Sequence, residues 1–493
     1  MIRLSAENRE KIGLEYVFSL MHPASPYGRA ALRELAFYEP SRQTELEKEF
    51  DCIAALRPAL MNGSEDIKRL RHALSQLRYI PESLKKLRNA ECLETTELFE
   101  LKSLLLRFED IYTVWRRLAE LFGIEGLEFA DTEAALDLID MDGMRTDGFH
   151  IPDSASAELA GARAQKRAFE RSIAAEQDEE AKKRLLTERT NVAAKEAEEE
   201  LRISRELCRT LSRFAADIKC NTEVAARIDL LLCKAELAEA HSGVRPKIGK
   251  TRICYENMIN PHAEALLRQH GGSFTPLSIE LSSGATVITG ANMGGKTMAL
   301  KTAALNTALC QLGFFPFAER AETVLVDGMY LLLDDNSAAE RGLSSFGGEV
   351  EAINEAVSAA DMELCFIAID EPARGTNPIE GAAIAAAVVQ HLNSQNTFAL
   401  ISTHYNGIAS RAGAHYQIAG LEKLGIGEVK KLSHTTLRER VAYIGENMDY
   451  SLKKAEKDAP CPHEAMNICR MMELNADIID YAENVLTKTE EIV

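Results

Sequence analysis

A glycine-rich segment between a short apolar run and a helix-forming stretch constrains the fold most. Residues 286–289 (Thr-Val-Ile-Thr) suit a buried strand, and residues 290–297 read Gly-Ala-Asn-Met-Gly-Gly-Lys-Thr. This fits the G-x-x-x-x-G-K-[ST] pattern, and good helix formers follow from Met298 to about Leu312. Such an order lets backbone N–H groups surround the phosphates of a nucleotide. The segment therefore predicts a phosphate-binding loop in an α/β domain.

The two residues that close this segment have specific expected roles. The ammonium group of Lys296 is expected to reach the β- and γ-phosphates, and the hydroxyl of Thr297 is expected to hold Mg²⁺. The predicted ligands are therefore ATP and Mg²⁺.

Two further strand ends carry polar residues that suit the same nucleotide. The apolar run 364–369 ends in Asp370 and Glu371, and the run 400–403 is followed by His404. Ligands of parallel sheets bind where the strands end, so these side chains are expected to meet. We expect Asp370 to bind Mg²⁺, Glu371 to act as the base that orients the attacking water, and His404 to contact the γ-phosphate or that water.

A second glycine-rich and serine-rich stretch precedes a predicted helix. Residues 344–349 read Ser-Ser-Phe-Gly-Gly-Glu, and the helix is expected to begin near Val350. A helix N-terminus of this kind binds anions. Two interpretations stay open: the stretch is a plain helix cap, or it completes the nucleotide site of a partner subunit.

The rest of the chain predicts helices on both sides of this domain. Residues 154–211 contain no proline and are rich in Ala, Glu, Lys and Arg, which indicates one long helix or a hairpin that turns near Gln177 and Asp178. The domains that we expect are a helical core (1–150), a helical lever or arm (151–211), the return of the core (212–243), a P-loop ATPase domain (244–430) and a C-terminal helical dimerisation segment (431–493).

Composition limits the location and the partners. The chain has 493 residues, of which 46% are hydrophobic and 27% charged, as in soluble proteins of several domains. It lacks an apolar run of about 18 residues, so we expect no membrane span. The ten cysteines include no C-x-x-C pair, which favours reduced thiols in the cytoplasm. The net charge of −19 disfavours tight non-specific binding to nucleic acid.

Taken together, the motifs resemble those of the MutS family, within the wider class of ABC-type ATPases. The segment 289–297 is similar to the family's TGPNMGGKS/T, and 370–381 (DEPARGTNPIEG) is similar to its DE-x-GRGT-x-x-x-(D/E)G. STHY at 402–405 matches the family's THY, and SSFGGE at 344–349 is a loosened version of STFMVEM. The first core segment and the closing helices are also similar, so the resemblance covers nearly the whole chain.

This resemblance implies a fold and a set of site residues. The fold is an α-helical core with a helical arm, followed by an α/β P-loop (ABC-type) ATPase domain and a C-terminal helical segment. Phe274 is implied to stack on adenine, Asn292 to contact phosphates, and Ser344 to be donated across a dimer. The implied nucleotide-binding residues are Phe274, Gly290, Asn292, Met293, Gly294, Gly295, Lys296, Thr297, Met298 and Ser344, with Glu371 and His404 catalytic and Thr297 and Asp370 at the metal.

The resemblance also implies a function. We expect a MutS-like ATPase that forms a homodimer, or a heterodimer with a related subunit, and associates with double-stranded DNA in mismatch repair or recombination. Because the sequence begins in the helical core, we expect it to lack the mismatch-recognition and connector domains. The alternative is an ATP-dependent reactivase of an adenosylcobalamin-dependent aminomutase acting on lysine or ornithine, without a DNA role, since short MutS-like proteins are associated with that chemistry.

Overall fold

The structure is a computed structural model that covers most of the chain in two units. The described residues are 4–61, 65–290, 295–333, 345–420 and 448–461, with a few positions beyond 461. Unit 1 comprises Met1–Met21, Ala36–Phe50 and Glu236–Val493, and unit 2 comprises His22–Leu35 and Asp51–Ala235. Helices predominate, and the described strands all lie in unit 1. Within the described residues, no helix has the length and apolar character that a membrane crossing requires.

Unit 2 consists of helices with buried apolar faces. The longest of those outside the arm, α7, begins with a capping box between Glu94 and Glu97 and buries Leu98, Leu101 and Leu104 at helical spacing. The elements of unit 2 are α3 (Pro26–Arg33), the second part of α4 (Gln43–Met61), α5 (Glu65–Ser75), α6 (Pro81–Arg88), α7 (Thr95–Phe122), α8 (Glu133–Ile139), η2 (Asp153–Ala155), α9 (Ala157–Ala175), α10 (Glu179–Leu211), η3 (Ser212–Phe214) and most of α11 (Ala215–Ala240).

A buried carboxylate fixes the start of α3. Asp229 of α11 accepts hydrogen bonds from the amide of Ala24 at 3.0 Å and from the amide and hydroxyl of Ser25 at 2.7 Å and 2.6 Å. Ser25 in turn accepts a hydrogen bond from the amide of Gly28 at 2.8 Å and so caps the helix. A Cβ atom on Gly28 would lie 2.2 Å from Oδ2 of Asp229, so only glycine fits there.

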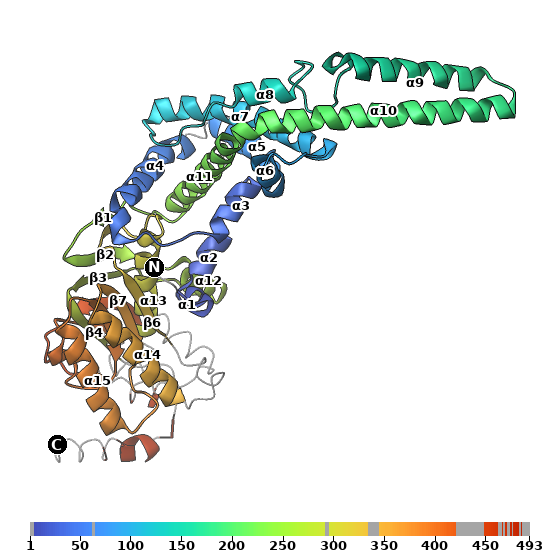
Figure 1. Ribbon diagram of the computed structural model, residues 1–493. Helices are drawn as coiled ribbons and strands as arrows, with labels where there is room; N and C mark the ends of the chain where they lie inside the picture. The colour runs from blue at the N-terminus through green and yellow to red at the C-terminus, as the bar shows by residue number, and fades with distance from the viewer. Residues whose placement is uncertain are drawn as a thin grey trace. The chain divides into compact units, whose positions relative to one another are not determined.

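The arm is a helical hairpin, the second of the two arrangements that the sequence allows. Helices α9 and α10 run side by side in opposite directions, as Figure 1 shows, and residues 176–178 join them. The side chain of Ser156 caps α9, and that of Asp178 caps α10. The acidic residues near the turn therefore begin a helix instead of continuing one.

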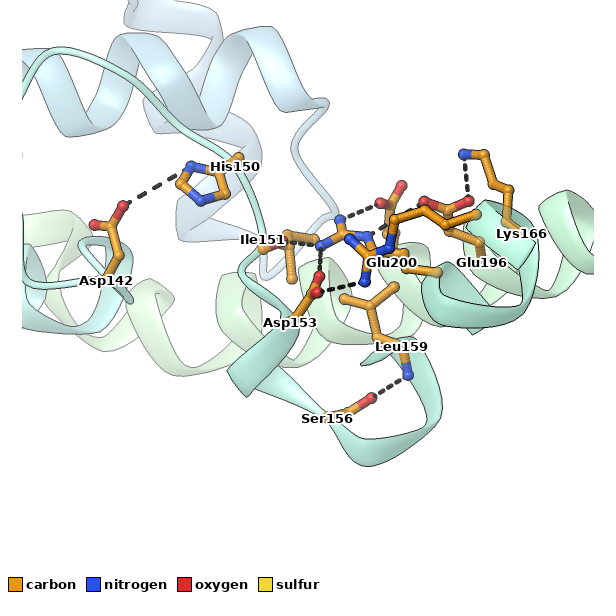
Figure 2. Close-up of polar contacts among 11 residues, drawn as sticks. Asp142, His150, Ile151, Asp153, Ser156, Leu159, Lys166, Glu196 and Glu200 are labelled. Carbon is orange, nitrogen blue, oxygen red and sulfur yellow. Dashed lines mark hydrogen bonds and ion pairs between the residues drawn. The ribbon is translucent and has the colours of Figure 1, made fainter. Parts of the chain in front are cut away.

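An ion-pair network joins the two helices at the base of the arm (Figure 2). Arg163 of α9 donates hydrogen bonds to the carbonyl of Ile151 at 2.8 Å, to Asp153 at 2.7 Å, to Glu196 at 3.2 Å and to Glu200 at 2.7 Å. These contacts raise the pKa of Arg163, the bond to Asp153 most of all. The guanidinium group thus fixes the register of α9 against α10.

Unit 1 contains two sheets. A six-stranded sheet has the order β10-β9-β4-β8-β7-β6, with all neighbours parallel except β10 and β9, and a mixed four-stranded sheet has the order β1-β5-β2-β3. The elements are α1 (Ala6–Ile12), α2 (Leu14–Ser19), η1 (Pro40–Arg42), the first part of α4, β1 (Lys247–Ile248), β2 (Arg252–Met258), α12 (Pro261–Gln269), β3 (Leu277–Ser282), β4 (Gly284–Thr289), α13 (Lys296–Gln311), β5 (Arg320–Thr323), β6 (Gly328–Leu332), α14 (Ser345–Ala360), β7 (Cys365–Asp370), α15 (Pro378–Asn393), β8 (Phe398–Thr403), η5 (Ala409–Arg411), β9 (Ala414–Gly420) and β10 (Asp449–Lys454).

The predicted helical domain 1–150 is divided between the units. Residues 1–21 and 36–50 belong to unit 1, and long-range hydrogen bonds attach them to the part of that unit that carries the sheets. The side chain of Asn8 donates to the carbonyl of Leu331 at 3.1 Å. The amide of Tyr38 donates to the carbonyl of Gln311 at 2.7 Å, and the Gln311 side chain returns a hydrogen bond to the Tyr38 carbonyl at 2.9 Å.

The structure also differs from two predicted boundaries. We expected helix over 431–493, whereas residues 449–454 form β10 and extend the six-stranded sheet. This strand lies at the sheet edge and ends in Lys453 and Lys454, and charged residues are common on edge strands because they oppose further pairing. The helix expected to begin near Val350 begins at Ser345 instead.

Candidate functional site

Strand β4 and helix α13 frame the predicted phosphate loop. All six residues of β4 are buried; Gly290, which follows, has a φ of 153°, and Gly295, the N-cap of α13, has a φ of 88°. A Cβ atom at Gly290 would lie 3.3 Å from Cβ of Ile418, and one at Gly295 would lie 3.1 Å from Cδ1 of Tyr450. Glycine suits both positions, because it adopts a positive φ without strain and has no Cβ atom to clash with these neighbours.

Lys296 and Thr297, in the first turn of α13, contact the end of β7. The Nζ atom of Lys296, a residue only 4% exposed, donates to the carbonyl of Gly290 at 2.8 Å and lies 3.3 Å from Oε1 of Glu371. The hydroxyl of Thr297 donates to Oδ2 of Asp370 at 2.6 Å. The structure therefore brings the two predicted loop residues and the two predicted acids into direct contact.

The strand order explains why these residues meet. Strand β8 lies between β4 and β7, and all three run parallel. Thr289 pairs with Thr403, and Asp370 pairs with Ser402, so the three strands end at the same edge of the sheet. Loops at the carboxyl edge of a parallel sheet are where ligands bind.

Ser402 of β8 joins both acids, although the sequence motifs did not single it out. Its hydroxyl donates a short hydrogen bond to Oδ1 of Asp370 and accepts one from the amide of Glu371 at 3.0 Å. The amide of Glu371 also donates to the carbonyl of Ser402 at 3.2 Å. A polar residue within a fully buried strand is the signal that could have identified it, since buried hydroxyl groups require partners.

The carboxylate of Glu371 has three nitrogen groups around it. Nζ of Lys296 lies 3.3 Å away, Nδ1 of His404 lies 3.6 Å away and Nε of Arg374 lies 4.0 Å away. The backbone of Glu371 is left-handed, with a φ of 50°, and that of Ala373 is also left-handed, with a φ of 63°. Such angles are unfavourable for residues with a side chain and occur often at functional sites. In this conformation, the carboxylate of Glu371 lies next to Lys296, in the first turn of α13.

The donor atoms fit a magnesium ion that is shared with a substrate. Thr297 and Asp370 offer a hydroxyl and a carboxylate, and Mg²⁺ prefers oxygen ligands, with water and phosphate oxygens completing its shell. In the described ranges, no group of three or more His, Cys, Asp or Glu side chains is placed to hold a metal by itself.

Other predicted residues do not join this cluster or cannot be placed. Met298 is half-buried in the first turn of α13. Phe274 lies half-buried in the loop before β3, and among the described residues no hydrogen bond or ring contact links it to the cluster. The predicted residues outside the described ranges are Asn292, Met293, Gly294 and Ser344.

A second set of polar contacts, which the sequence motifs did not indicate, involves the last residue of β4. The hydroxyl of Thr289 is 2.7 Å from Nε2 of His415, and Nδ1 of the same ring is 2.7 Å from the carbonyl of Glu456. A carbonyl only accepts, so Nδ1 carries a proton, and in the neutral ring Nε2 accepts from Thr289. These contacts tie the end of β4 to the residues after β10.

Comparison with known proteins gives a consistent likeness for this region. The family described as MutS domain V matches residues 286–489. A protein named Endonuclease MutS2 from Levilactobacillus brevis is 32% identical over 213 residues, which are 43% of this chain and 26% of that protein. Endonuclease MutS2 from Fusobacterium nucleatum is 28% identical over 304 residues, 60% of this chain and 37% of that protein.

A similar likeness extends to a mismatch repair protein. The protein named DNA mismatch repair protein MutS from Thermus thermophilus is 32% identical over 182 residues, 37% of this chain and 22% of that protein. The matched part thus covers between about a fifth and two fifths of the relatives' lengths. The matched family segment holds the last four residues of β4 together with α13, β7 and β8, and therefore the cluster described above.

Proposed function

We propose that the chain is a member of the MutS family, and that it binds ATP with Mg²⁺ at the carboxyl edge of β4, β8 and β7 and hydrolyses it. The observation that carries the proposal is the convergence of four groups: Lys296 with Glu371, and Thr297 with Asp370. A lysine and a hydroxyl at a helix N-terminus, facing two carboxylates, match the chemical needs of phosphoryl transfer to water.

Each group has a proposed task. Lys296 binds the β- and γ-phosphates and exchanges its contact with Glu371 for them. Thr297 and Asp370 hold Mg²⁺, which supplies Lewis-acid polarisation of the phosphate oxygens. Glu371, released from Lys296, orients a water and accepts its proton, and His404, 3.6 Å from Glu371, contacts the γ-phosphate or that water.

Three variants test the hydrolysis. We expect Glu371→Gln to lower kcat about 100-fold or more while ATP still binds, because general-base catalysis contributes about 10²–10⁴-fold. Lys296→Ala is expected to weaken ATP binding. Glu380→Gln serves as the matched control, since Glu380 lies on the exposed side of α15. Equal kcat in Glu371→Gln and Glu380→Gln would contradict the assigned base.

We further propose that the protein acts on double-stranded DNA in repair or recombination, as the names of its relatives suggest. Although the chain is acidic, one segment of unit 2 is basic. Residues 68–88 of α5, α6 and the loop between them include one acid, Glu82. Their basic residues are Lys68, Arg69, Arg71, Arg78, Lys85, Lys86 and Arg88. We propose this basic segment as the surface that meets DNA phosphates.

A charge-reversal experiment tests this DNA contact. We expect the variant Lys85→Glu with Arg88→Glu to bind a duplex at least about tenfold more weakly at low salt, and to lose part of the salt dependence of binding. The control reverses two exposed charges elsewhere in unit 2, Arg116→Glu with Lys219→Glu. Equal DNA affinities of the two double variants would contradict the surface.

Stimulation of ATP hydrolysis separates the DNA role from the alternative. Duplex DNA that raises kcat of the wild type, but not of Glu371→Gln, supports a DNA-coupled ATPase. Hydrolysis that is indifferent to every duplex would favour a protein client such as an aminomutase. We also propose a dimer in which the start of α14, with Ser344, completes the site of the partner subunit, and sedimentation with and without ATP tests that assembly.

A further inference from the structure

A buried glutamate of α14 contacts the turn that follows Glu371. Glu349 is 8% exposed, and its Oε1 atom accepts a short hydrogen bond from the amide of Ala373. The two residues are 24 positions apart in the sequence, so the contact joins separate elements. The glycine-rich and serine-rich pattern of residues 344–349 indicates a helix N-terminus but gives no sign of this contact.

The turn needs outside support because its backbone is unfavourable. Glu371 and Ala373 both have left-handed backbone angles, and Ala373 is almost fully buried. The amide of Glu371 is held from the β8 side by Ser402, at 3.0 Å from its hydroxyl. The amide of Ala373 is held from the α14 side by Glu349. Two side chains from different elements therefore fix the two ends of the turn.

Close packing limits the turn at two further points. A Cβ atom on Gly381 would lie 2.8 Å from the carbonyl oxygen of Ala373 and 2.6 Å from the hydroxyl of Tyr405. A Cβ atom on Gly375 would lie 3.3 Å from Cβ of Phe346, which belongs to the first turn of α14. The start of α14 and the turn after Glu371 thus pack together as well as sharing a hydrogen bond.

We propose that Glu349 is a positioning residue for ATP hydrolysis: by accepting the Ala373 amide, it keeps the turn in the conformation that aims Glu371 at the attacking water. This inference rests on the proposed ATPase function. Glu349 acts through the backbone and touches no substrate, so its loss is expected to slow the chemical step without weakening ATP binding. That pattern is expected for an interaction that matters chiefly in the transition state.

The test compares substitutions that separate the acceptor from the charge. Glu349→Gln keeps a carbonyl oxygen at the same reach, whereas Glu349→Met keeps the length of the side chain but offers no comparable acceptor; both remove the charge. A third variant, Glu349→Asp, keeps the charge and withdraws the acceptor by one methylene group. The measurements are kcat, the Kd for ATP in the presence of Mg²⁺, and the thermal unfolding midpoint of each variant.

We expect kcat of Glu349→Met to fall about 10- to 100-fold, since a misplaced catalytic group costs about that much. Glu349→Gln is expected to stay within about threefold of the wild type, and Glu349→Asp to lie between the two. The Kd for ATP is expected to change less than about threefold in all of them, as for loss of an interaction made mainly in the transition state. If Glu349→Met does not fold, Glu349→Asp carries the test.

Several outcomes would overturn the inference. Equal kcat in Glu349→Asp and the wild type would show that the acceptor position is unimportant. Equal losses in Glu349→Gln and Glu349→Met would assign the effect to charge, and a parallel loss of ATP affinity would assign it to the fold of the site. A wild type that does not hydrolyse ATP would refute the proposed function, and this inference with it, whereas an active wild type with unaffected Glu349 variants would refute the inference alone.

Discussion

Replacing Ser402 by alanine tests the part of the site that the sequence did not reveal. The change removes a hydrogen bond donated to the carboxylate of Asp370 and one accepted from the amide of Glu371. A bond to a charged group contributes about 1.5–3 kcal/mol and a neutral one about 0.5–1.5 kcal/mol. The amide of Glu371 keeps the Ser402 carbonyl at 3.2 Å, so we expect a total loss of about 2 kcal/mol.

This loss is expected in catalysis as well as in stability. Asp370 would no longer be held from the β8 side, so the concentration of Mg²⁺ that half-saturates hydrolysis is expected to rise. If the full 2 kcal/mol falls on the transition state, kcat/KM falls about 30-fold, since about 1.4 kcal/mol corresponds to a factor of ten.

The assay measures ATP hydrolysis against Mg²⁺ concentration, with thermal unfolding alongside. Ser410→Ala is the matched control, because Ser410 donates one hydrogen bond to the carbonyl of Gly407 at 2.7 Å on the exposed side of η5. If Ser402→Ala and Ser410→Ala gave the same Mg²⁺ dependence and the same kcat/KM, Ser402 would not organise the two acids and the reasoning would fail.

Three further predictions concern the frame around the site. Arg163→Met should speed proteolysis at the base of the arm several-fold, because Arg163 joins α9 to α10, whereas Arg202→Met, which breaks contacts within α10 only, should not. Burial lowers the pKa of His241 in the folded protein, so the unfolded state binds more protons in acid. The free energy of unfolding is therefore unaffected by this ring above about pH 6.5 and decreases as the pH falls below that value. Thermal unfolding of His241→Gln should therefore depend less on pH between about 7 and 5 than that of the wild type. Gly28→Ala should destabilise unit 2 by about 2 kcal/mol or more in denaturant unfolding, because the added methyl group would clash with the buried carboxylate of Asp229.

Local sequence patterns predicted several of the strands and helices. Short apolar runs that end in glycine, acid or histidine identified β4, β7 and β8 and the residues at their ends, because burial on both faces of a parallel sheet demands such runs. The helical character of residues 154–211 was equally readable. Two helix caps accompany the hairpin: Ser156 caps α9 and Asp178 caps α10. Such caps are also short-range signals.

The contacts between distant segments could not be predicted in the same way. Nothing near Asn8 or Tyr38 indicates that their partners lie at Leu331 and Gln311, about 300 residues later. The role of Ser402 depends on strand order, since its partners come from β7, the neighbouring strand. Residues 449–454 form a strand where helix is expected, because this edge strand ends in two lysines and lacks the continuous apolar run that marks a central strand.

The ion pair of Lys296 with Glu371 has a consequence for the proposed selectivity of the site. In the structure the lysine already contacts one carbonyl and one carboxylate, so an incoming phosphate has to compete for it. A single phosphate offers little in exchange, whereas a nucleoside triphosphate with Mg²⁺ brings enough charge and enough contacts to displace both partners. In the proposed mechanism, the same exchange frees the carboxylate of Glu371 to orient the attacking water. Nucleotide binding and release of the Glu371 carboxylate would therefore be one event. Smaller phosphates would bind weakly and would not release that carboxylate.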